Sequence, residues 1–291
     1  MRLKNTVTLI MTKMGIRLFR LIPFFGIYLL SDLLRFFLKR VIRYRRKVIF
    51  ANLSTSFTEL SAAEIEAIGH KTYQNLCDIT LESIKGLSMS PEHLRERYRI
   101  VNPEILDHSF QRGESVILAG AHYGNWEWGV RSWSLWFKHK VMGIYKPLAN
   151  KTVESFLNAR REDFGMKLVS PKHTKTAIEE AQKNPCLLVL FGDQNPHNLN
   201  TCHWVPFLFR DTAWLQGVAE ISHQKNFSVY YLKTQRIKRG YYESRLVPLV
   251  ENPTELRPLE ISERYAAMVE QNIREKPEDW LWSHKRWKHK R

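Results

Sequence analysis

Continuous apolar runs alternate with amphipathic stretches along the part of the chain that follows residue 100. The apolar runs, which predict strands, lie at 115–121, 141–145, 186–192, 227–233 and 241–249. The amphipathic stretches, which predict helices, lie at 125–138, 151–164, 174–183, 212–224 and 260–275. This alternation predicts an α/β fold with a central, mostly parallel or mixed sheet flanked by helices. A polar turn between the last two runs predicts a hairpin at that point.

Residues 41–99 carry apolar positions at helical spacing, and Ser61 with Glu64 three positions later forms the pattern of a capping box. We see no linker rich in Gly, Pro or Ser and no repeated period. The predicted organisation is therefore an arm over 1–40 and one domain over 41–291. Within that domain, 41–99 is a helical lead-in and 100–291 is the α/β part.

The arm contains an apolar stretch from Leu21 to Leu30, which is shorter than the roughly 20 residues that a membrane-spanning helix needs. Extending the stretch to Leu38 includes Asp32 and Arg35. Leucines and aromatics interleaved with arginines favour a helix that lies in the membrane surface, or a marginal span. The alternative is a helix buried in the protein core.

The formal net charge is +16, and residues 1–50 hold twelve Lys and Arg against one acidic residue. Such a balance predicts acidic partners, which are nucleic acid, anionic lipid or a phosphorylated substrate. The apolar stretch beside this charge favours the membrane, because binding to nucleic acid does not require it. Cys77, Cys186 and Cys202 form no paired framework, as is usual in a reducing compartment.

The segment "AGAHYGNWEWG" (119–129) follows an apolar run and carries the first candidate chemistry. Ligands of open α/β sheets bind at the carboxyl ends of strands, where His122 stands. Asn125 is a good helix N-cap, so Glu127 falls in the first turn of a helix and can fold back towards His122. A carboxylate on one ring nitrogen leaves the other free to accept a proton, as a general base does. The alternative is a structural histidine beside a helix start.

A second apolar run ends in "LFGDQNPHN", where Asp193 and Gln194 are candidate binding residues. The alternative is a polar turn that ends a buried strand. His197, Cys202 and His203 are the candidate metal ligands nearby, but their spacing fits no common zinc site, so we expect no metal.

A third group of candidates is basic and lies between residues 145 and 165. Lys146, Arg160 and Arg161 are suited to binding a phosphate or stabilising an oxyanion. Alternatively, they form a solvated helix face.

With these residues identified, the chain resembles the bacterial lipid A biosynthesis (late, or secondary) acyltransferases, within the wider glycerophosphate and lysophospholipid acyltransferases. Five segments carry the resemblance in order: "RRKVIFANLSTSF", "AHYGNWEWG", "YKPLAN", "FGDQNP" and "PEDWLWSHKRWK". The resemblance implies a glycerophosphate-acyltransferase-like fold. It also implies a location on the cytoplasmic face of the cell inner membrane, where the anionic lipids are further partners.

The implied reaction moves a fatty acyl chain from acyl carrier protein or acyl-CoA to a hydroxyl of a phosphorylated lipid A precursor, without cofactor or metal. His122 would be the general base and Glu127 its partner in the motif. Lys146 stands where relatives often have arginine, and Asp193 and Gln194 lie in a second shared block. One alternative keeps the chemistry but changes the acceptor to an aminolipid, a mannolipid or a lysophospholipid. The other is a non-catalytic basic protein that binds membranes or nucleic acid; on the acyltransferase reading no nucleic acid is a partner.

Overall fold

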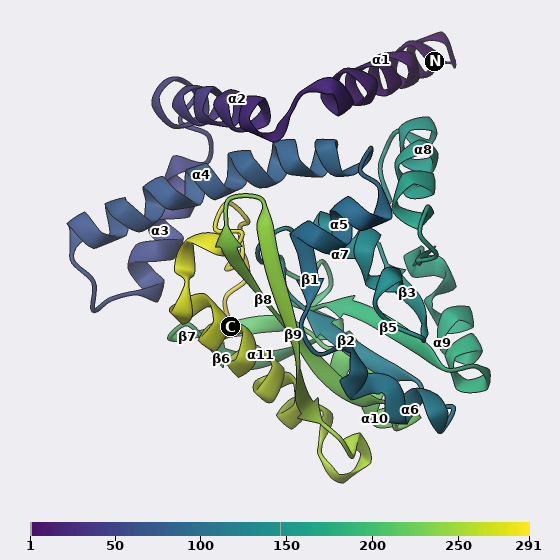
Figure 1. The fold of residues 1–291 in the computed structure, drawn as a ribbon. Helices are drawn as coiled ribbons and strands as arrows, with labels where there is room; N and C mark the ends of the chain where they lie inside the picture. The colour runs from purple at the N-terminus through teal and green to yellow at the C-terminus, as the bar shows by residue number, and fades with distance from the viewer. Residues whose placement is uncertain (1, 146) are drawn as a thin grey trace.

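The computed structural model describes residues 2–145 and 147–291, and its centre is a seven-stranded sheet (Figure 1). The strand order is β1-β9-β8-β2-β5-β3-β4. The strands are β1 (Tyr98–Ile100), β2 (Val116–Gly120), β3 (Lys140–Ile144), β4 (Lys167–Val169), β5 (Cys186–Phe191), β8 (Ser228–Lys238) and β9 (Tyr241–Val250). Only the β8–β9 pair is antiparallel among these neighbours. The predicted α/β fold and its hairpin are therefore confirmed.

Helices cover both faces of this sheet. Their bounds are α1 (Arg2–Leu21), α2 (Phe24–Phe36), α3 (Arg46–Ser56), α4 (Ala62–Gly86), α5 (Pro91–Arg97), α6 (Asp107–Gln111), α7 (Trp126–Ser132), α8 (Lys151–Glu162), α9 (Thr174–Lys183), α10 (Gly217–Lys225) and α11 (Pro258–Glu275). Ile117 and Ala119 of β2 pack in one hydrophobic cluster with α9, α10 and α11, whereas Val116 and Leu118 pack in a second cluster with α5 and α7. Burial on both faces explains why this strand reads as a continuous apolar run.

The structure corrects one predicted element. Residues 212–224 were expected to form one helix, but the stretch begins inside β7 (Arg210–Leu215) and only α10 follows. Strand β7 pairs with β6 (Cys202–Phe207) in a separate two-stranded sheet. This pairing was not visible in the sequence because the three consecutive buried positions of β7 lack strand alternation. The capping box at Ser61 and Glu64 is confirmed at the start of α4.

The N-terminal arm forms α1 and α2, which lie on the outer side of α4 (Figure 1). Ile27 and Ser31 of α2 are fully buried. The opposite side exposes large apolar side chains, namely Ile10, Met11, Met14, Leu18, Leu21, Phe25, Leu29, Leu30, Leu33, Phe36, Phe37, Val41 and Ile42. Among the described residues, no single helix is long and apolar enough to cross a membrane. The bent pair Thr8–Leu21 and Phe24–Val41, taken together, has the length and composition of a membrane span.

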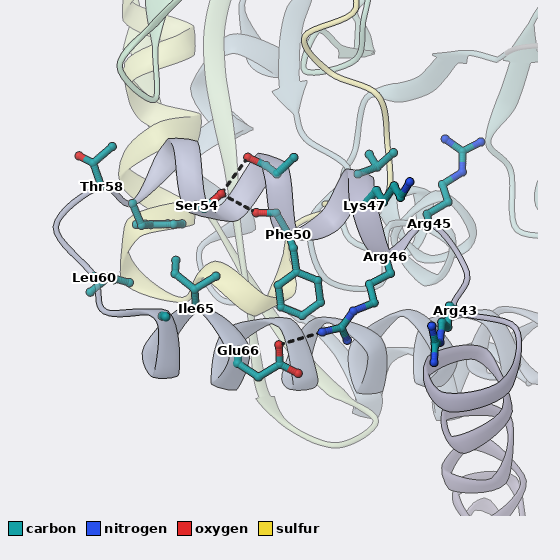
Figure 2. Close-up of a pocket in the computed structure, with 14 residues that line it drawn as sticks. Arg43, Arg45, Arg46, Lys47, Phe50, Ser54, Thr58, Leu60, Ile65 and Glu66 are labelled. Carbon is teal, nitrogen blue, oxygen red and sulfur yellow. Dashed lines mark hydrogen bonds and ion pairs between the residues drawn. The ribbon is translucent and has the colours of Figure 1, made fainter.

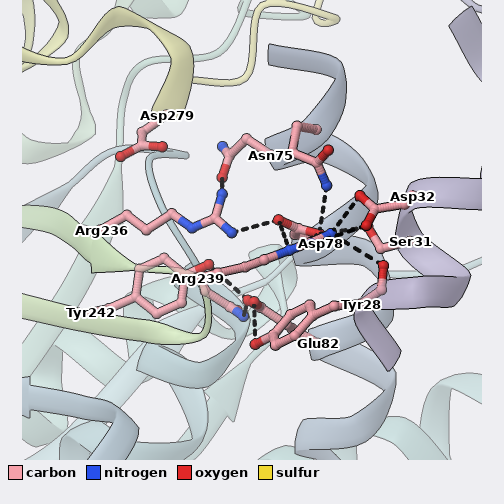
Figure 3. A network of polar contacts seen from close by, with 12 residues as sticks. Tyr28, Ser31, Asp32, Asn75, Asp78, Glu82, Arg236, Arg239, Tyr242 and Asp279 are labelled. Atoms are coloured by element: carbon pink, nitrogen blue, oxygen red, sulfur yellow. Dashed lines mark hydrogen bonds and ion pairs between the residues drawn. The ribbon is translucent and has the colours of Figure 1, made fainter. Parts of the chain in front are cut away.

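A polar network connects α2 to α4 and to the β8–β9 hairpin (Figure 3). Asp78 of α4 is fully buried and forms ion pairs with Arg236 (2.5 Å) and Arg239 (2.6 Å) at the β8–β9 turn. Arg239 also pairs with Asp32 of α2 at 3.0 Å, and Ser31 donates to Asp78. Burial acts to lower the pKa of Arg236, but the surrounding acidic groups outweigh burial and raise that pKa above its usual value. The arm is therefore attached to a buried Asp78 through Ser31 and through the partly exposed Arg239–Asp32 ion pair.

The predicted domain boundaries fall inside continuous structure. The boundary after residue 40 lies in the π-helical turn Phe37–Val41 that ends α2, and the boundary after residue 99 lies within β1. The division of the chain into an arm, a lead-in and an α/β part remains a prediction.

Candidate active site

His122 and Asp193 each stand two residues beyond the end of a central strand. Strands β2 and β5 are parallel neighbours, and their register pairs Gly120 with Phe191. Since the carboxyl ends of parallel neighbours meet at one edge of the sheet, the residues that follow them are brought side by side. The fold thus unites two segments that are 71 positions apart.

The Asp193 carboxylate holds His122 at two points. Its Oδ1 lies 2.7 Å from Nδ1 of the imidazole, and its Oδ2 accepts the backbone N–H of His122 at 2.8 Å. The indole Nε1 of Trp280 donates to the same Oδ2 at 2.9 Å. Three donors around one carboxylate fix its orientation and that of the ring.

Charge and burial assign the protons at this pair. Asp193 is 2% exposed, and burial alone would raise its pKa. The charge of His122 and the hydrogen bonds from His122 and Trp280 outweigh burial and lower the pKa of Asp193 below its usual range. An ionised Asp193 accepts from Nδ1–H, so Nε2 is the ring nitrogen that can accept a proton. This arrangement suits a general base.

Tyr265 of α11 ties the two strand ends together. Its hydroxyl donates to the carbonyl of Gly120 and accepts the backbone N–H of Gly192 at 2.9 Å. A Cβ at Gly120 would stand 2.2 Å from the ring of Phe191, so only glycine allows this close approach. The loops that carry the histidine and the aspartate are therefore held by the core itself.

The C-terminal segment 280–284 crosses the histidine loop. The Leu281 N–H donates to the carbonyl of His122 at 3.2 Å. The amide of Asn52, on α3, donates to the carbonyls of Trp282 and His284, each at 3.0 Å. Helix α3 thus positions the segment that supplies Trp280 to the site.

Two basic residues of the chain end lie behind Asp193. His284 accepts the Asn195 N–H on Nε2 at 3.0 Å, and burial lowers its pKa to about 4. Arg286 is 1% exposed and stands 5.1 Å from the ring of Trp214, and burial lowers its pKa to about 10. Among the described residues its guanidinium has no hydrogen-bond partner. The negative charge of Asp193 acts to raise the pKa of both groups, but burial outweighs it.

Comparison with known proteins decides the identity. The family described as bacterial lipid A biosynthesis acyltransferase matches residues 2–289. This chain belongs to that family. It is also 21% identical over 255 residues to the lipid A biosynthesis lauroyltransferase of Escherichia coli (strain K12), a match that covers 86% of this chain and 81% of that protein. The resemblance drawn from the five segments is confirmed, and the chain is an acyltransferase.

Glu127 does not take the position expected of the motif's second residue in this acyltransferase. It stands in the first turn of α7, as predicted, but its carboxylate forms a two-pronged ion pair with Arg161 of α8. The two bonds are 3.0 Å from Nε to Oε2 and 2.8 Å from Nη2 to Oε1. We expected the carboxylate of Glu127 to fold back towards His122; in the described part of the chain it contacts Arg161, and Asp193 lies against Nδ1 of His122. The catalytic role of Glu127 stays a prediction.

The other predicted binding residues have separate surroundings. Arg160 is about half exposed and pairs with Asp163 at 3.3 Å. Gln194 follows Asp193 and is half-buried. Lys146 lies outside the described residues. The predicted binding set is therefore not united in one place, and its role stays a prediction.

The metal ligands that we weighed from the sequence have other surroundings. Nδ1 of His203 lies 2.8 Å from the hydroxyl of Ser262, and the thiol of Cys202 donates to the carbonyl of Leu199. Within the part of the chain that the structure describes, no three His, Cys, Asp or Glu side chains converge on a possible metal position.

A small apolar cavity of about 160 Å³ lies close to the candidate catalytic histidine, although His122 is not among its lining residues. Trp126 lines it, and the same ring packs edge-on against His122 with centroids 5.3 Å apart. Leu76 and Ile79 of α4 and Trp282 complete much of the wall. Trp128, the second tryptophan of the same segment, is fully buried and donates to the carbonyl of Glu82 in α4.

Sequence reasoning missed Trp280, His284 and Arg286 as parts of the site. The closing segment "PEDWLWSHKRWK" was noticed only as a mark of the resemblance. The signal for Asp193 was present, since two apolar strand runs each ended in a polar residue at the same offset. Reading it required the strand order, which places β5 directly beside β2.

Proposed function

We propose that this acyltransferase moves a fatty acyl chain from a thioester, on acyl carrier protein or coenzyme A, to a hydroxyl of a lipid A precursor. The observation that carries the proposal is the His122–Asp193 pair, together with a nearby apolar cavity lined by Trp126 and Trp280, which contact the two residues of the pair. A base needs an available ring nitrogen, and an acyl chain needs apolar surface close to it.

In the proposed reaction, Nε2 of His122 takes the proton of the acceptor hydroxyl as its oxygen attacks the thioester carbonyl. A tetrahedral intermediate forms with its negative charge on the former carbonyl oxygen. When that intermediate collapses, the carbon–sulfur bond breaks and the imidazolium returns the proton to the leaving thiolate. Asp193 stabilises the imidazolium between these steps and keeps Nε2 directed at the substrate.

This account transfers the partner role from Glu127 to Asp193. Glu127 would instead act indirectly, by positioning α8 through its ion pair with Arg161. Arg160 at the end of the same helix is half exposed, so we propose it as a contact for an acceptor phosphate.

We further propose that the enzyme works at the cytoplasmic face of the inner membrane. The exposed apolar side of α1 and α2 and the basic balance of residues 1–50 support contact with an anionic bilayer. Apolar contact is not weakened by salt, whereas charge pairing is screened. Membranes washed at high salt should therefore retain the protein until detergent is added, and complete release by salt would contradict this part.

Mass spectrometry of total lipids tests the reaction directly. A strain that lacks this protein should accumulate a lipid A precursor lighter by one acyl chain, and the wild-type gene should restore the missing chain. The mass difference gives the length of the transferred chain. An unchanged lipid A together with an altered aminolipid, mannolipid or lysophospholipid would replace the proposed acceptor with another.

A further inference from the structure

A groove of about 1090 Å³ runs between α3 and α4, outside the cavity beside His122 (Figure 2). Its walls are largely apolar, and Phe50, Leu60 and Ile65 are among the residues that form them. Figure 2 shows Phe50 and Ile65 projecting into the space between the two helices, with Leu60 at one end and the basic side chains gathered at the other. The groove is therefore apolar along its length and cationic at one end.

The cationic end is formed by the run Val41 to Lys47, in which every residue is exposed. Arg43, Arg45, Arg46 and Lys47 from this run line the groove. Among the described lining residues, Glu66 is the sole carboxylate, and it lies 3.4 Å from Arg46. Most of the positive charge at this end is thus not neutralised by the protein.

The backbone of the run is unusual in the same place. Arg43 and Arg45 have φ angles of 53° and 48°, in the left-handed region that residues with a Cβ rarely adopt. Strained positions of this kind cluster at sites that clamp ligands. A second recess shares Arg43, Arg46 and Glu66 and adds Arg40, which is exposed, so the basic surface continues towards α2.

The groove also meets the exposed apolar side of the arm. Phe36, Phe37, Val41 and Ile42 are exposed at the end of α2 and in the turn beyond it, directly before the basic run. An occupant that fits both features has a compact anionic group and a long apolar tail. An acidic protein would match the charge but would leave the apolar slot between α3 and α4 empty.

We propose that the groove between α3 and α4 binds one anionic glycerophospholipid from the surrounding bilayer. Its phosphate would lie against Arg43 and Arg46, because guanidinium groups bind phosphate oxygens through two parallel hydrogen bonds. One of its acyl chains would lie along Phe50, Leu60 and Ile65. This site is separate from the acyl-transfer site, and its occupancy does not depend on the proposed reaction.

Helix α3 gives the site a connection to the catalytic loops. The guanidinium of Arg45 donates to the carbonyl of Ser283 at 3.2 Å, and Asn52 holds the segment 280–284 from the same helix. A lipid that orders α3 is therefore expected to order the segment that carries Trp280.

Native mass spectrometry of the full chain in neutral detergent tests the proposal. The probes are phosphatidylglycerol, phosphatidylcholine with the same acyl chains, and glycerol phosphate, which has the head-group charge but no chains. We expect one phosphatidylglycerol to remain bound and neither of the other two probes to do so. Equal retention of phosphatidylcholine, or binding of glycerol phosphate alone, would overturn the proposal that the groove recognises both the anionic head group and an acyl chain.

Two kinds of variant distinguish lipid binding in the groove from non-specific lipid binding elsewhere on the protein. Ser54→Trp places a large ring in the groove at an exposed position, and Arg43→Gln with Arg46→Gln removes the phosphate contacts. The arginine variant is expected to weaken phosphatidylglycerol binding by roughly tenfold or more, because it loses charge-assisted hydrogen bonds. Ser54→Trp should weaken binding by a similar factor, because its ring occupies the space in which the acyl chain would be buried. Matched controls on α9 and its entry turn are Thr176→Trp, and Lys172→Gln with Lys175→Gln, all at exposed positions.

The controls should bind like the wild type. If Ser54→Trp, folded by its circular dichroism and melting temperature, keeps wild-type affinity, the groove is not the site. The same conclusion follows if the control variants lose the lipid to the same extent. Ala51→Trp fills the same groove from the next turn of α3 and replaces Ser54→Trp if that variant does not fold.

Discussion

The imidazole Nδ1 of His122 lies 2.7 Å from the carboxylate of Asp193, although 71 positions separate the two residues. Parallel pairing of β2 and β5 creates this contact, and Trp280 completes it from the end of the chain. The motif residue Glu127 meets Arg161 instead. The predictions on Trp280, on the Glu127–Arg161 pair and on the His122–Asp193 pair depend on these contacts.

Trp280→Phe should lower kcat without unfolding the protein. The change removes the indole N–H that donates to Asp193 and keeps most of the buried ring. A hydrogen bond to a charged group contributes about 1.5–3 kcal/mol, so turnover should fall roughly 10- to 100-fold. Turnover is measured beside thermal unfolding, with Trp136→Phe, whose indole N–H has no hydrogen-bond partner among the described residues, as the control. Equal losses in both variants would show a general packing effect.

Glu127 and Arg161 should be coupled to each other in stability. Both side chains are partly exposed, so we expect a coupling energy of about 1–2 kcal/mol for this two-pronged pair. Glu127→Gln and Arg161→Gln are compared with the double variant by urea unfolding. If Glu127 instead orients His122, Glu127→Gln alone would reduce turnover by about 10²–10⁴ and Arg161→Gln would not. That result would restore the partner expected from the sequence motif.

Narrowing the cavity beside His122 should change the preferred acyl chain. Leu76→Trp adds a large side chain to the wall of this small space. Each methylene contributes about 0.8 kcal/mol when buried, so a donor two methylenes shorter should gain roughly tenfold relative to the original one. Ala67→Trp, at an exposed position of the same helix, is the control. An unchanged order of donor chain lengths in Leu76→Trp would exclude this cavity as the chain-length ruler.

The stability of the protein should depend on His284 at mildly acidic pH. Burial lowers the pKa of His284 to about 4, whereas an unfolded histidine titrates near 6.5. The unfolded chain therefore takes up the proton first as pH falls. The contribution of a neutral His284 is complete above about pH 6.5 and is lost as pH falls towards about 4.

The measurement is the free energy of unfolding as a function of pH for the wild type and His284→Gln, which retains an acceptor for the Asn195 N–H. Between about pH 4 and 6.5, the free energy of unfolding of the wild type should change with pH more steeply than that of His284→Gln, by up to about 1.4 kcal/mol per pH unit. Parallel curves would show that His284 is not kept neutral by the fold.

The sequence predicted the features that depend on local pattern. The apolar runs of β2 and β5, the hairpin and the capping box at Ser61 were all found, because each is written in a few consecutive residues. Strands β6 and β7 were missed, since their pairing and burial depend on contacts with α11 and the core.

The candidate site also contains some residues that the local sequence pattern predicts and others that only the folded chain brings together. His122 was recognisable from its glycines and its place after a strand. The carboxylate that contacts its ring was not recognisable, because that contact depends on strand order, and because Glu127 is held by an arginine that stands 34 positions beyond it. Trp280 could not be placed, because only the folded chain brings its end across the histidine loop.

A thermodynamic cycle on His122 and Asp193 tests the central claim. Turnover with an acyl thioester and a lipid A precursor is measured for His122→Ala, Asp193→Asn and the double variant, each shown to be folded by its melting temperature. Each single variant should lose about 10²–10⁴ in rate, and the double variant should be little worse than His122→Ala, because both residues serve one proton transfer. A folded Asp193→Asn protein with near-normal turnover, or losses that multiply in the double variant, would contradict the account.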